Sequence, residues 1–272
     1  MGDKLGRSAL IVSGGVVALV IIVGLIAPFI EYDPAEAVDY ARRRLGPSGE
    51  HIFGTDDQGR DVAMRVFMGI NAFFLPGIVA ATITMSLGAL TGALVGYARG
   101  PLQAVTLYGM QLIDTLPRLI FLILVCTILD PSMMLIAVVT GLLFIPTVAR
   151  VIQRRVEALA SEDYILAHIA HGFSTPRILL YHILWLQCRP LLIRQGAYVF
   201  GYVLFVETAL SYLGDYGVQE PTPSWGNMVA QARDTGIEAY WAWMFPALAI
   251  VVAISGFLAF GNLVARRAEA VR

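Results

Sequence analysis

The sequence predicts an all-α integral membrane protein, and three observations lead to this fold class. Hydrophobic residues make up 57% of the 272 residues and charged residues only 14%, with a mean hydropathy of +0.71, whereas soluble domains hold about 45 to 50% apolar and about 25% charged residues. Several uncharged runs reach about 20 residues, the length an α-helix needs to cross a hydrocarbon core of about 30 Å. The polar segments have room for short helices only, so we expect one membrane domain over residues 1–272.

Six helices are expected to cross the membrane. They cover residues 9–30, 73–97, 102–129, 131–149, 195–214 and 241–265. The first is interpreted as a retained helix, because its apolar run is longer than the roughly 7 to 15 residues typical of a secretory signal. The second carries Gly88, Gly92 and Gly96 at every fourth position, a small-residue face that favours close helix contact.

The other four spans carry polar or helix-breaking residues. Asp114 and Arg118 flank Pro117 in the third span, where their i, i+4 spacing allows an ion pair, most simply a structural one. Pro146 lies near the end of the fourth span. The fifth contains Glu207, and the sixth begins at Trp241, an aromatic typical of the membrane interface.

The distribution of arginine predicts the orientation, since basic residues concentrate in short cytoplasmic loops. Residues 150–194 hold six arginines against three acidic residues, and the C-terminus is also basic. The segment of residues 31–69 holds eight carboxylates against five arginines and is expected outside. Six spans then place both termini in the cytoplasm.

Several functional classes are disfavoured by composition. The net charge of −1 gives no basic excess for nucleic acid. Lys4 is the only lysine, so no phosphate-binding loop of the GxxxxGK[ST] type occurs later in the chain. No nucleophile triad, HExxH or paired-carboxylate arrangement points to catalysis, and we expect neither an enzyme nor a bound cofactor.

The sequence of the expected cytoplasmic connection, residues 150–194, predicts two helices joined by a turn, which we call the elbow. Helical periodicity runs to His171, Gly172 suits the residue after a helix C-cap, and Thr175 with Pro176 suits the start of a second helix. A short helix carried between two spans is a good handle for a partner protein. An amphipathic helix resting at the membrane interface is an equally simple interpretation.

Two segments outside this elbow are similar to a known family. Residues 51–61 read HIFGTDDQGRD, and residues 210–228 read LSYLGDYGVQEPTPSWGNM. They resemble signatures of the C-type permease subunits of ABC importers for dipeptides, oligopeptides and nickel. The elbow resembles that family's EAA loop more weakly, because Leu166 stands in place of its glutamate, His168 in place of its second alanine and Trp185 in place of a proline.

This resemblance implies a type I ABC importer transmembrane domain in the bacterial inner membrane. Its partners would be a second permease, two ATPase subunits, an extracytoplasmic binding protein and membrane lipid. Peptides are the expected cargo because they are the commonest in the family. The residues expected to contact the ATPase are Glu162, Asp163, Leu166, Ala167, His168 and Gly172.

Two alternatives stay open at this point. One is a self-contained channel or secondary transporter, and the other is a membrane scaffold that has lost coupling. An ATPase that accompanies the chain would separate the first from an importer, and stimulated ATPase activity would argue against the second.

The remaining candidate residues each allow a functional and a structural interpretation. Glu207 is expected to face the bundle interior, as a gate residue or a helix-helix hydrogen-bond partner. Trp225 is interpreted as part of an outer gate or as an interfacial plug. The polar and glycine residues of the 51–61 segment either contact the binding protein or fold the outer segment. His168 and His171 share a helix face, but no carboxylate or cysteine stands at ligand spacing, so a metal site is not favoured.

Overall fold

The computed structural model describes residues 2–98, 100–129, 132–213, 216–231 and 236–270. These ranges contain helices and loops but no β-strand. In chain order the helices are α1 (Gly2–Ile26), α2 (Val62–Met68), α3 (Phe74–Tyr97), α4 (Pro101–Asp114), α5 (Arg118–Ile128), α6 (Met133–Leu143), α7 (Ile145–Ala160), α8 (Asp163–Ala170), α9 (Thr175–Arg177), the π-helix η4 (Ile178–Trp185), α10 (Arg189–Tyr212), α11 (Trp225–Ala230) and α13 (Trp241–Ala270). The all-α prediction is confirmed.

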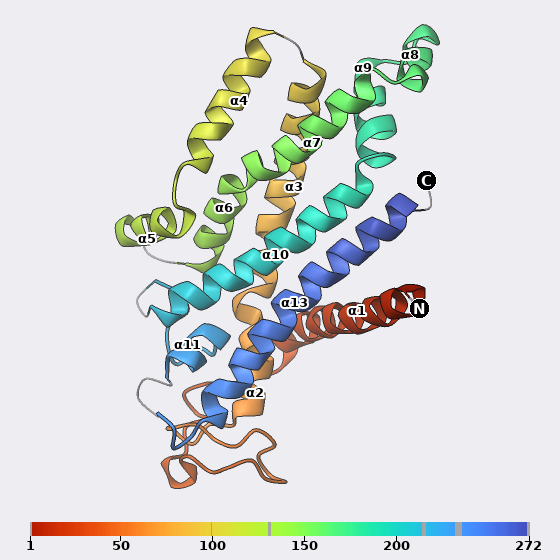
Figure 1. Cartoon of the computed structure of the whole chain (residues 1–272). Coiled ribbons are helices and arrows are strands. Elements are labelled where there is room, and N and C mark those ends of the chain that lie inside the picture. Colours follow the sequence, from red (N-terminus) through yellow and green to blue (C-terminus); the bar gives the residue numbers. More distant parts are fainter. Residues whose placement is uncertain (1, 99, 130–131, 214–215, 232–235, 271–272) are drawn as a thin grey trace.

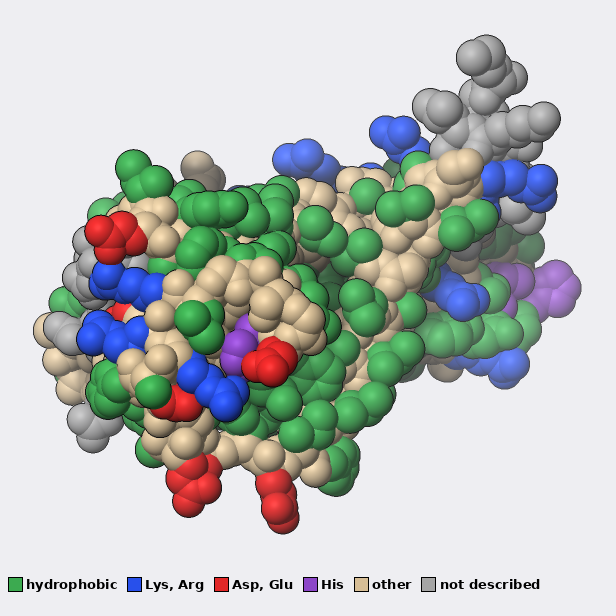
Figure 2. Space-filling model, turned by 90° about the horizontal axis from the view of Figure 1, so that it is seen from below, with side chains coloured by type: hydrophobic (Ala, Val, Ile, Leu, Met, Phe, Trp, Pro, Cys, Tyr) green, Lys and Arg blue, Asp and Glu red, His purple; other side chains and the backbone are tan. Residues whose placement is uncertain are grey.

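The helices form a tilted bundle with two polar ends. Figure 1 shows the outer segment at the lower end, below α2 and α11, and α8 at the opposite, upper end; the C-terminal end of α13 lies on the right below α8, and the N-terminal end of α1 lies on the right at about mid-height. Charged side chains gather at both ends, and the surface between them is mostly hydrophobic (Figure 2). An apolar belt between charged ends is the surface expected of a chain that spans a bilayer.

Four helical segments of the described residues are long and apolar enough to cross a membrane, or five if a bent pair counts as one span. The four cover Gly6–Phe29, Val62–Tyr97, Met133–Ala160 and Trp241–Ala268. The expected fifth span, now α10, is not among them, and residue 214 at its predicted end lies outside the described residues. Since α10 packs between α3 and α13, protein covers part of its surface and full apolarity is not required. The count of six stays a prediction.

The third expected span is broken. Helices α4 and α5 meet at an angle of 76° across Thr115–Pro117, so the segment expected as the third span, residues 102–129, is built from two helices rather than one. Pro117 has the extended backbone angles φ −67° and ψ 104°. A proline disfavours helical geometry in the residue before it, which here is Leu116. The proline that the sequence showed therefore ends one helix rather than bending it.

The fourth expected span continues past its predicted end at residue 149. Pro146 lies in the first turn of α7, where a proline is tolerated because the N–H it lacks has no helical partner there. Helix α7 then runs to Ala160 with buried Val148, Ile152 and Val156 on one side. The arginines on its other side made this stretch read as a loop in the sequence.

The glycine face of α3 brings α3 and α7 into close contact, as predicted. A Cβ atom added to Gly88 would lie 2.9 Å from the Cβ of Val148, and one on Gly92 would lie 2.9 Å from the Cβ of Ile152. A Cβ on Gly96 would lie 2.8 Å from the Cβ of Val156. Only glycine permits this helix separation, so the spacing of four residues found in the sequence fixes the position of α7 and the elbow that it carries.

Candidate functional site

The elbow contains an exposed helix, α8 (Asp163–Ala170), that is anchored along one face. Helix α8 projects from the end of α7 (Figure 1) and buries Ile165 completely in a cluster that includes Val156, Ile178 and Ile183. Tyr164 packs against the same cluster. One anchored face and a free opposite face give a rigid surface that a partner protein can reach.

The turn of the elbow is a Schellman motif at Gly172. Gly172 has φ +79°, and its N–H donates to the carbonyl oxygen of Ile169 at 2.9 Å. The N–H of Phe173 donates to the carbonyl oxygen of His168 at 3.1 Å, which completes the motif. The predicted role of Gly172 after the helix C-cap is confirmed.

Two details of the elbow differ from the prediction. The N-cap of the second helix is Ser174 rather than Thr175, so that helix starts one residue earlier than expected. The first helix does not run unbroken to His171, because α7 ends at Ala160 and α8 begins at Asp163. This break separates α8 from α7 as a short helix of its own.

The six residues expected to contact an ATPase all lie on α8 or its ends. Glu162 is the N-cap of α8, and Asp163 is its first residue, with both side chains exposed. Ala167 is exposed in the middle of the helix, while Gly172 forms the turn. Leu166 belongs to the helix, but its side chain lies outside the described part. The acidic N-terminal turn complements the helix dipole and also leaves two carboxylates available to a partner.

His168 is half-buried in an aromatic cluster rather than displayed toward a partner. Its ring centroid lies 4.1 Å from that of His182 and 5.2 Å from that of Phe173. Partial desolvation, with His168 and Arg177 nearby, lowers the pKa of His182 below its usual range. His171 points elsewhere, since its Nδ1 lies 2.7 Å from the carbonyl oxygen of Ala167. Within the described residues, no three histidine, cysteine or acidic side chains gather into a group able to hold a metal.

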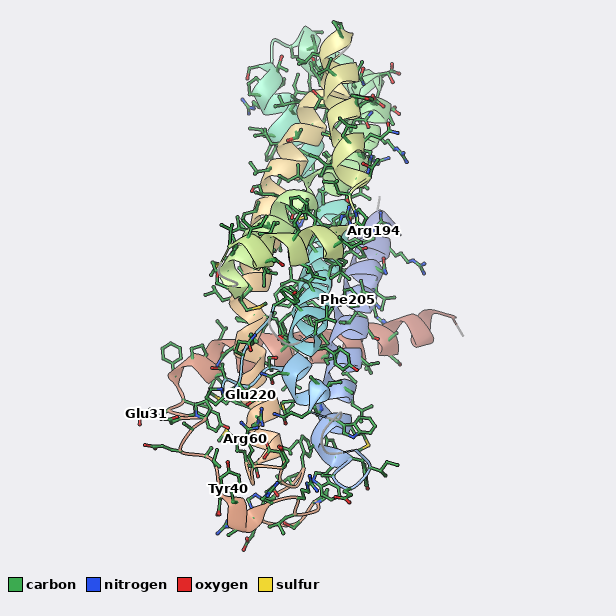
Figure 3. The ribbon with its side chains drawn as sticks, turned by 90° about the vertical axis from the view of Figure 1, so that its left-hand side faces the viewer. Glu31, Tyr40, Arg60, Arg194, Phe205 and Glu220 are labelled. Atoms are coloured by element: carbon green, nitrogen blue, oxygen red, sulfur yellow. The ribbon has the colours of Figure 1, made fainter. Side chains whose placement is uncertain are left out.

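Three buried charges of the outer segment, those of Asp56, Arg60 and Arg65, form a cluster with Glu220 that the sequence did not reveal. Asp56 Oδ2 accepts from Arg60 Nε at 2.8 Å and also pairs with Arg65 Nη1. Glu220 accepts from Arg60 Nη1 and Arg65 Nη2, each at 2.7 Å. The side chains of both arginines are fully buried, and Figure 3 shows Glu220 beside Arg60 between the outer segment and α11. We call these four residues the outer charge cluster.

The outer charge cluster joins the two signature segments. Asp56 and Arg60 belong to residues 51–61, whereas Glu220 belongs to residues 210–228. Burial alone would raise the pKa of Asp56, but Arg65 and Arg60, with the backbone N–H of Arg60, outweigh it and lower this pKa. The carboxylates of Asp56 and Glu220 raise the pKa of Arg60 against the opposite effect of its burial. Asp56 and Arg60 therefore stay ionised, and the ion pairs of the cluster hold the two segments together.

Several other signature residues of the outer segment make structural contacts. Gly54 and Gly59 have φ +75° and φ +79°, and a Cβ on Gly59 would collide with the carbonyl oxygen of Asp39. Thr55 is fully buried, and its carbonyl oxygen accepts from Trp241 Nε1 at 3.0 Å. Asp61 caps α2 by accepting from the N–H of Met64 at 2.8 Å. These contacts support the folding role of the motif.

Trp225 and Glu207 are both buried on the protein side of α10 and α11. Trp225 Nε1 donates to the carbonyl oxygen of Val66 at 2.8 Å, and its ring lies 4.9 Å from that of Phe73. Glu207 is 0% exposed, as expected of a carboxyl inside a span, and Oε1 accepts from Ser211 Oγ at 2.8 Å. Ser211 is one turn along the same helix, and Ser224, the N-cap of α11, is a further side-chain hydrogen-bond partner of this carboxyl group. Trp225 also lines a cavity of about 310 Å³ between α1, α2 and α13.

Asp114 and Arg118 pair at 2.9 Å, as their spacing predicted. Arg150 of α7 also pairs with Asp114, and Arg118 Nη2 donates to Thr147 Oγ1 at 2.6 Å. The sequence did not predict these contacts from α7, because Thr147 and Arg150 lie about 30 positions from their partners in the chain and only the fold brings them together.

Comparison with known proteins identifies the family of this chain. A sequence model of the family described as "Binding-protein-dependent transport system inner membrane component" matches residues 88–270, more than half of the chain. The chain belongs to this family. A putative peptide transport system permease protein of Brucella suis is 32% identical to it over 240 residues, covering 88% of this chain and 80% of the relative.

Two further relatives have similar coverage. A dipeptide transport system permease protein of Alkalihalophilus pseudofirmus is 29% identical over 242 residues, covering 89% of this chain and 79% of the relative. An oligopeptide transport system permease protein of Bacillus subtilis is 27% identical over 260 residues, covering 96% of this chain and 83% of the relative. The chain is therefore a multi-pass inner-membrane transport permease of the ABC peptide permease family rather than a catalytic enzyme.

Proposed function

We propose that this permease is one of the two membrane subunits of an ATP-driven importer for di- or oligopeptides. A second permease completes the passage, two ATPase subunits power it, and an extracytoplasmic binding protein delivers the cargo. The membership of the family and the names of the peptide permease relatives support this proposal. The chain crosses the membrane six times, with α10 as the span that protein partly covers, and both termini lie in the cytoplasm.

The exposed helix α8 carries the coupling in this proposal. Its free face holds Glu162, Asp163 and Ala167, while Ile165 fixes the opposite face to the ends of α7 and η4. A partner that moves α8 therefore moves α7, and α7 is packed closely on the glycines of α3. Motion of the ATPase is transmitted along this contact because packed helices shift as bodies rather than deforming.

Glu162 and Asp163 take the place of the glutamate that the elbow lacks at Leu166. Both are exposed at the start of α8, where they can form charge-assisted hydrogen bonds with basic side chains of an ATPase groove. At the other end of the molecule, the outer charge cluster and Trp225 keep the outer loop closed on the bundle. Glu207 lies beneath this loop and stabilises its position through Ser211.

Co-purification from membranes tests this proposal. The tagged chain is isolated and its companions are identified by mass spectrometry, alongside Ala167→Arg on α8 and Glu50→Arg on the exposed outer segment as a matched control. We expect a second permease and ATPase subunits with the native chain and with Glu50→Arg. Ala167→Arg should retain the second permease and lose the ATPase. A chain that purifies alone would favour a self-contained channel or secondary transporter instead.

A further inference from the structure

A cavity that several polar side chains help to line opens between helices of the permease. It has a volume of about 290 Å³ and lies where α7, α10 and α13 meet. Five of its six lining side chains are polar, and the set comprises Thr147, Arg194, Gln195, Tyr198, Leu258 and Asn262. By contrast, α1 exposes Ile11, Val12 and Leu19 to its surroundings. An apolar face suits lipid, whereas this polar face requires water or protein.

The ion group of Asp114, Arg118 and Arg150 adjoins this cavity. Arg118 reaches the cavity residue Thr147 through its 2.6 Å hydrogen bond. The guanidinium of Arg118 also lies 3.9 Å from the centroid of the Phe144 ring, and that ring is 5.9 Å from the ring of the cavity residue Tyr198. The cavity and the ion group therefore form one continuous surface, which we call the inner wall.

Much of the inner wall belongs to candidate membrane-spanning helices, since Arg150 lies within Met133–Ala160 and Asp114 and Arg118 lie in the bent pair of α4 and α5. Arg150 lies ten residues before the end of α7 at Ala160, which corresponds to about 15 Å along the helix axis. Figure 3 shows Arg194 far from Glu220 and Arg60 of the outer end. The side chains of Arg118 and Arg150 are 22% and 33% exposed. Ionisable groups at such depth are costly beside lipid and commonly face a substrate pathway.

The inner wall has an excess of positive charge. Its three arginines face one carboxylate, that of Asp114, and Arg194 forms no ion pair with any residue that the structure describes. A planar guanidinium matches a carboxylate in geometry as well as in charge. We propose that the inner wall lines the cytoplasmic half of the transport passage and that its arginines bind the carboxylate of a passing substrate. This inference rests on the proposed function, because an unmodified peptide carries such a group at its C-terminus.

Charged thiol reagents test the electrostatics without any cargo. The two native cysteines, Cys126 and Cys188, are buried and give a low background. In the assembled complex, the ratio of the reaction rate with an anionic methanethiosulfonate to that with a cationic one is measured for Gln195→Cys and for the exposed control Glu50→Cys. We expect this ratio to be about tenfold higher for Gln195→Cys. Adding Arg194→Gln should remove most of this preference. Equal rates for both reagents, or no reaction with either, would overturn the inference.

Lipid headgroups are the alternative source of negative charge at these arginines. The same labelling is therefore repeated in nanodiscs of zwitterionic and of anionic lipid. We expect the anionic preference to be equal in both, since the inner wall faces the passage. A preference that disappears in anionic lipid would show that headgroups occupy the arginines, and the inference would be wrong.

Transport of a matched peptide pair tests the substrate preference. Uptake of one tripeptide is compared with that of its C-terminal amide, using the same binding protein with the native complex, Arg118→Gln and Arg118→Lys. We expect Arg118→Gln to lower the ratio of acid to amide uptake at least threefold, and Arg118→Lys to retain most of it. An unchanged ratio in Arg118→Gln refutes the inference alone. The absence of ATP-dependent uptake of either peptide by the native complex refutes the proposed function itself.

Discussion

The outer charge cluster gives the sharpest test of how the outer segment is held. Asp56→Asn keeps the shape of the side chain and allows Oδ1 to go on accepting the N–H groups of Gln58 and Arg60. The other carboxylate oxygen, Oδ2, is replaced by an amide NH2 group. This group faces the guanidinium groups of Arg60 and Arg65 and cannot accept their hydrogen bonds. Two buried cations are then left with one carboxylate, that of Glu220.

The size of the effect follows from burial. The side chain of Asp56 is 2% exposed and both arginine side chains are 0% exposed, so the loss falls in the range of about 3 to 5 kcal/mol found for a broken buried ion pair. Glu220→Gln removes a charge that is 37% exposed. Water can then replace part of the interaction, and the cost should be about 1 kcal/mol.

Hydrogen exchange of the intact permease in nanodiscs measures both variants. Suitable reporters are the N–H of Thr55, bonded to the carbonyl oxygen of Leu45, and the N–H of Val62, bonded to that of Gly54. Exchange at these amides should be about 100-fold to 3000-fold faster in Asp56→Asn and about fivefold faster in Glu220→Gln. Glu50→Gln, exposed on the same segment, should leave exchange unchanged. An effect of Glu220→Gln equal to or larger than that of Asp56→Asn would refute the reasoning.

Three other outcomes follow from the same structure. The pKa of Asp56 is lower in the folded protein, so the stability that its charge contributes is complete above the ordinary pKa of about 3.9 and is lost as pH falls through the lower folded value. Tryptophan emission should therefore show the outer segment opening only below about pH 4. Opening near neutral pH would contradict this prediction. Gly92→Ala places a methyl group against the carbonyl oxygen of Ala149 and should lower stability by about 1 to 3 kcal/mol, measured by thermal unfolding in detergent, whereas Gly109→Ala, with open space around it, should be neutral or slightly stabilising. Gly172→Ala should speed hydrogen exchange in the elbow about fivefold, since φ +79° costs a non-glycine residue about 1 kcal/mol. Space around Gly172 is open, so Gly172→Asn, whose residue tolerates this backbone conformation better, should have a smaller effect. Equal effects of the two variants would argue against a backbone cause.

Local backbone chemistry was the part of the fold most visible in the sequence. The four-residue glycine spacing of α3 predicted a close helix contact, and Gly172 predicted the end of a helix. Each feature depends on the absence of one side chain at one position, so a single residue carries the information. The pairing of Asp114 with Arg118 was also local, because one helical turn separates the two residues.

Features that depend on distant partners were not predicted. Arg60 and Arg65 read as surface charges of a polar segment, and only the folded chain brings Glu220 to them. Proline was ambiguous, since Pro117 ends α4 while Pro146 starts α7, and the sequence gives both the same residue type. Helix α7 was cut short at residue 149 because its arginines were interpreted as the start of a loop, although they lie on one side of a continuing helix.

The roles of the site residues depend on proteins outside this chain. The structure places Glu162, Asp163 and Ala167 on an exposed helix, and it places Glu207 and Trp225 in the interior. Exposure makes the first group available to an ATPase, and burial gives the second group structural contacts within the bundle. The contacts that would make either group functional involve partner subunits.

ATP-dependent uptake into proteoliposomes is the measurement that tests the central claim most directly. The complete complex is reconstituted with native chain or with Ala167→Arg, and uptake of a labelled oligopeptide is followed with and without ATP and binding protein. We predict uptake that requires both and that is lost in Ala167→Arg. Uptake that continues without ATPase subunits, or that follows an ion gradient instead, would contradict the account.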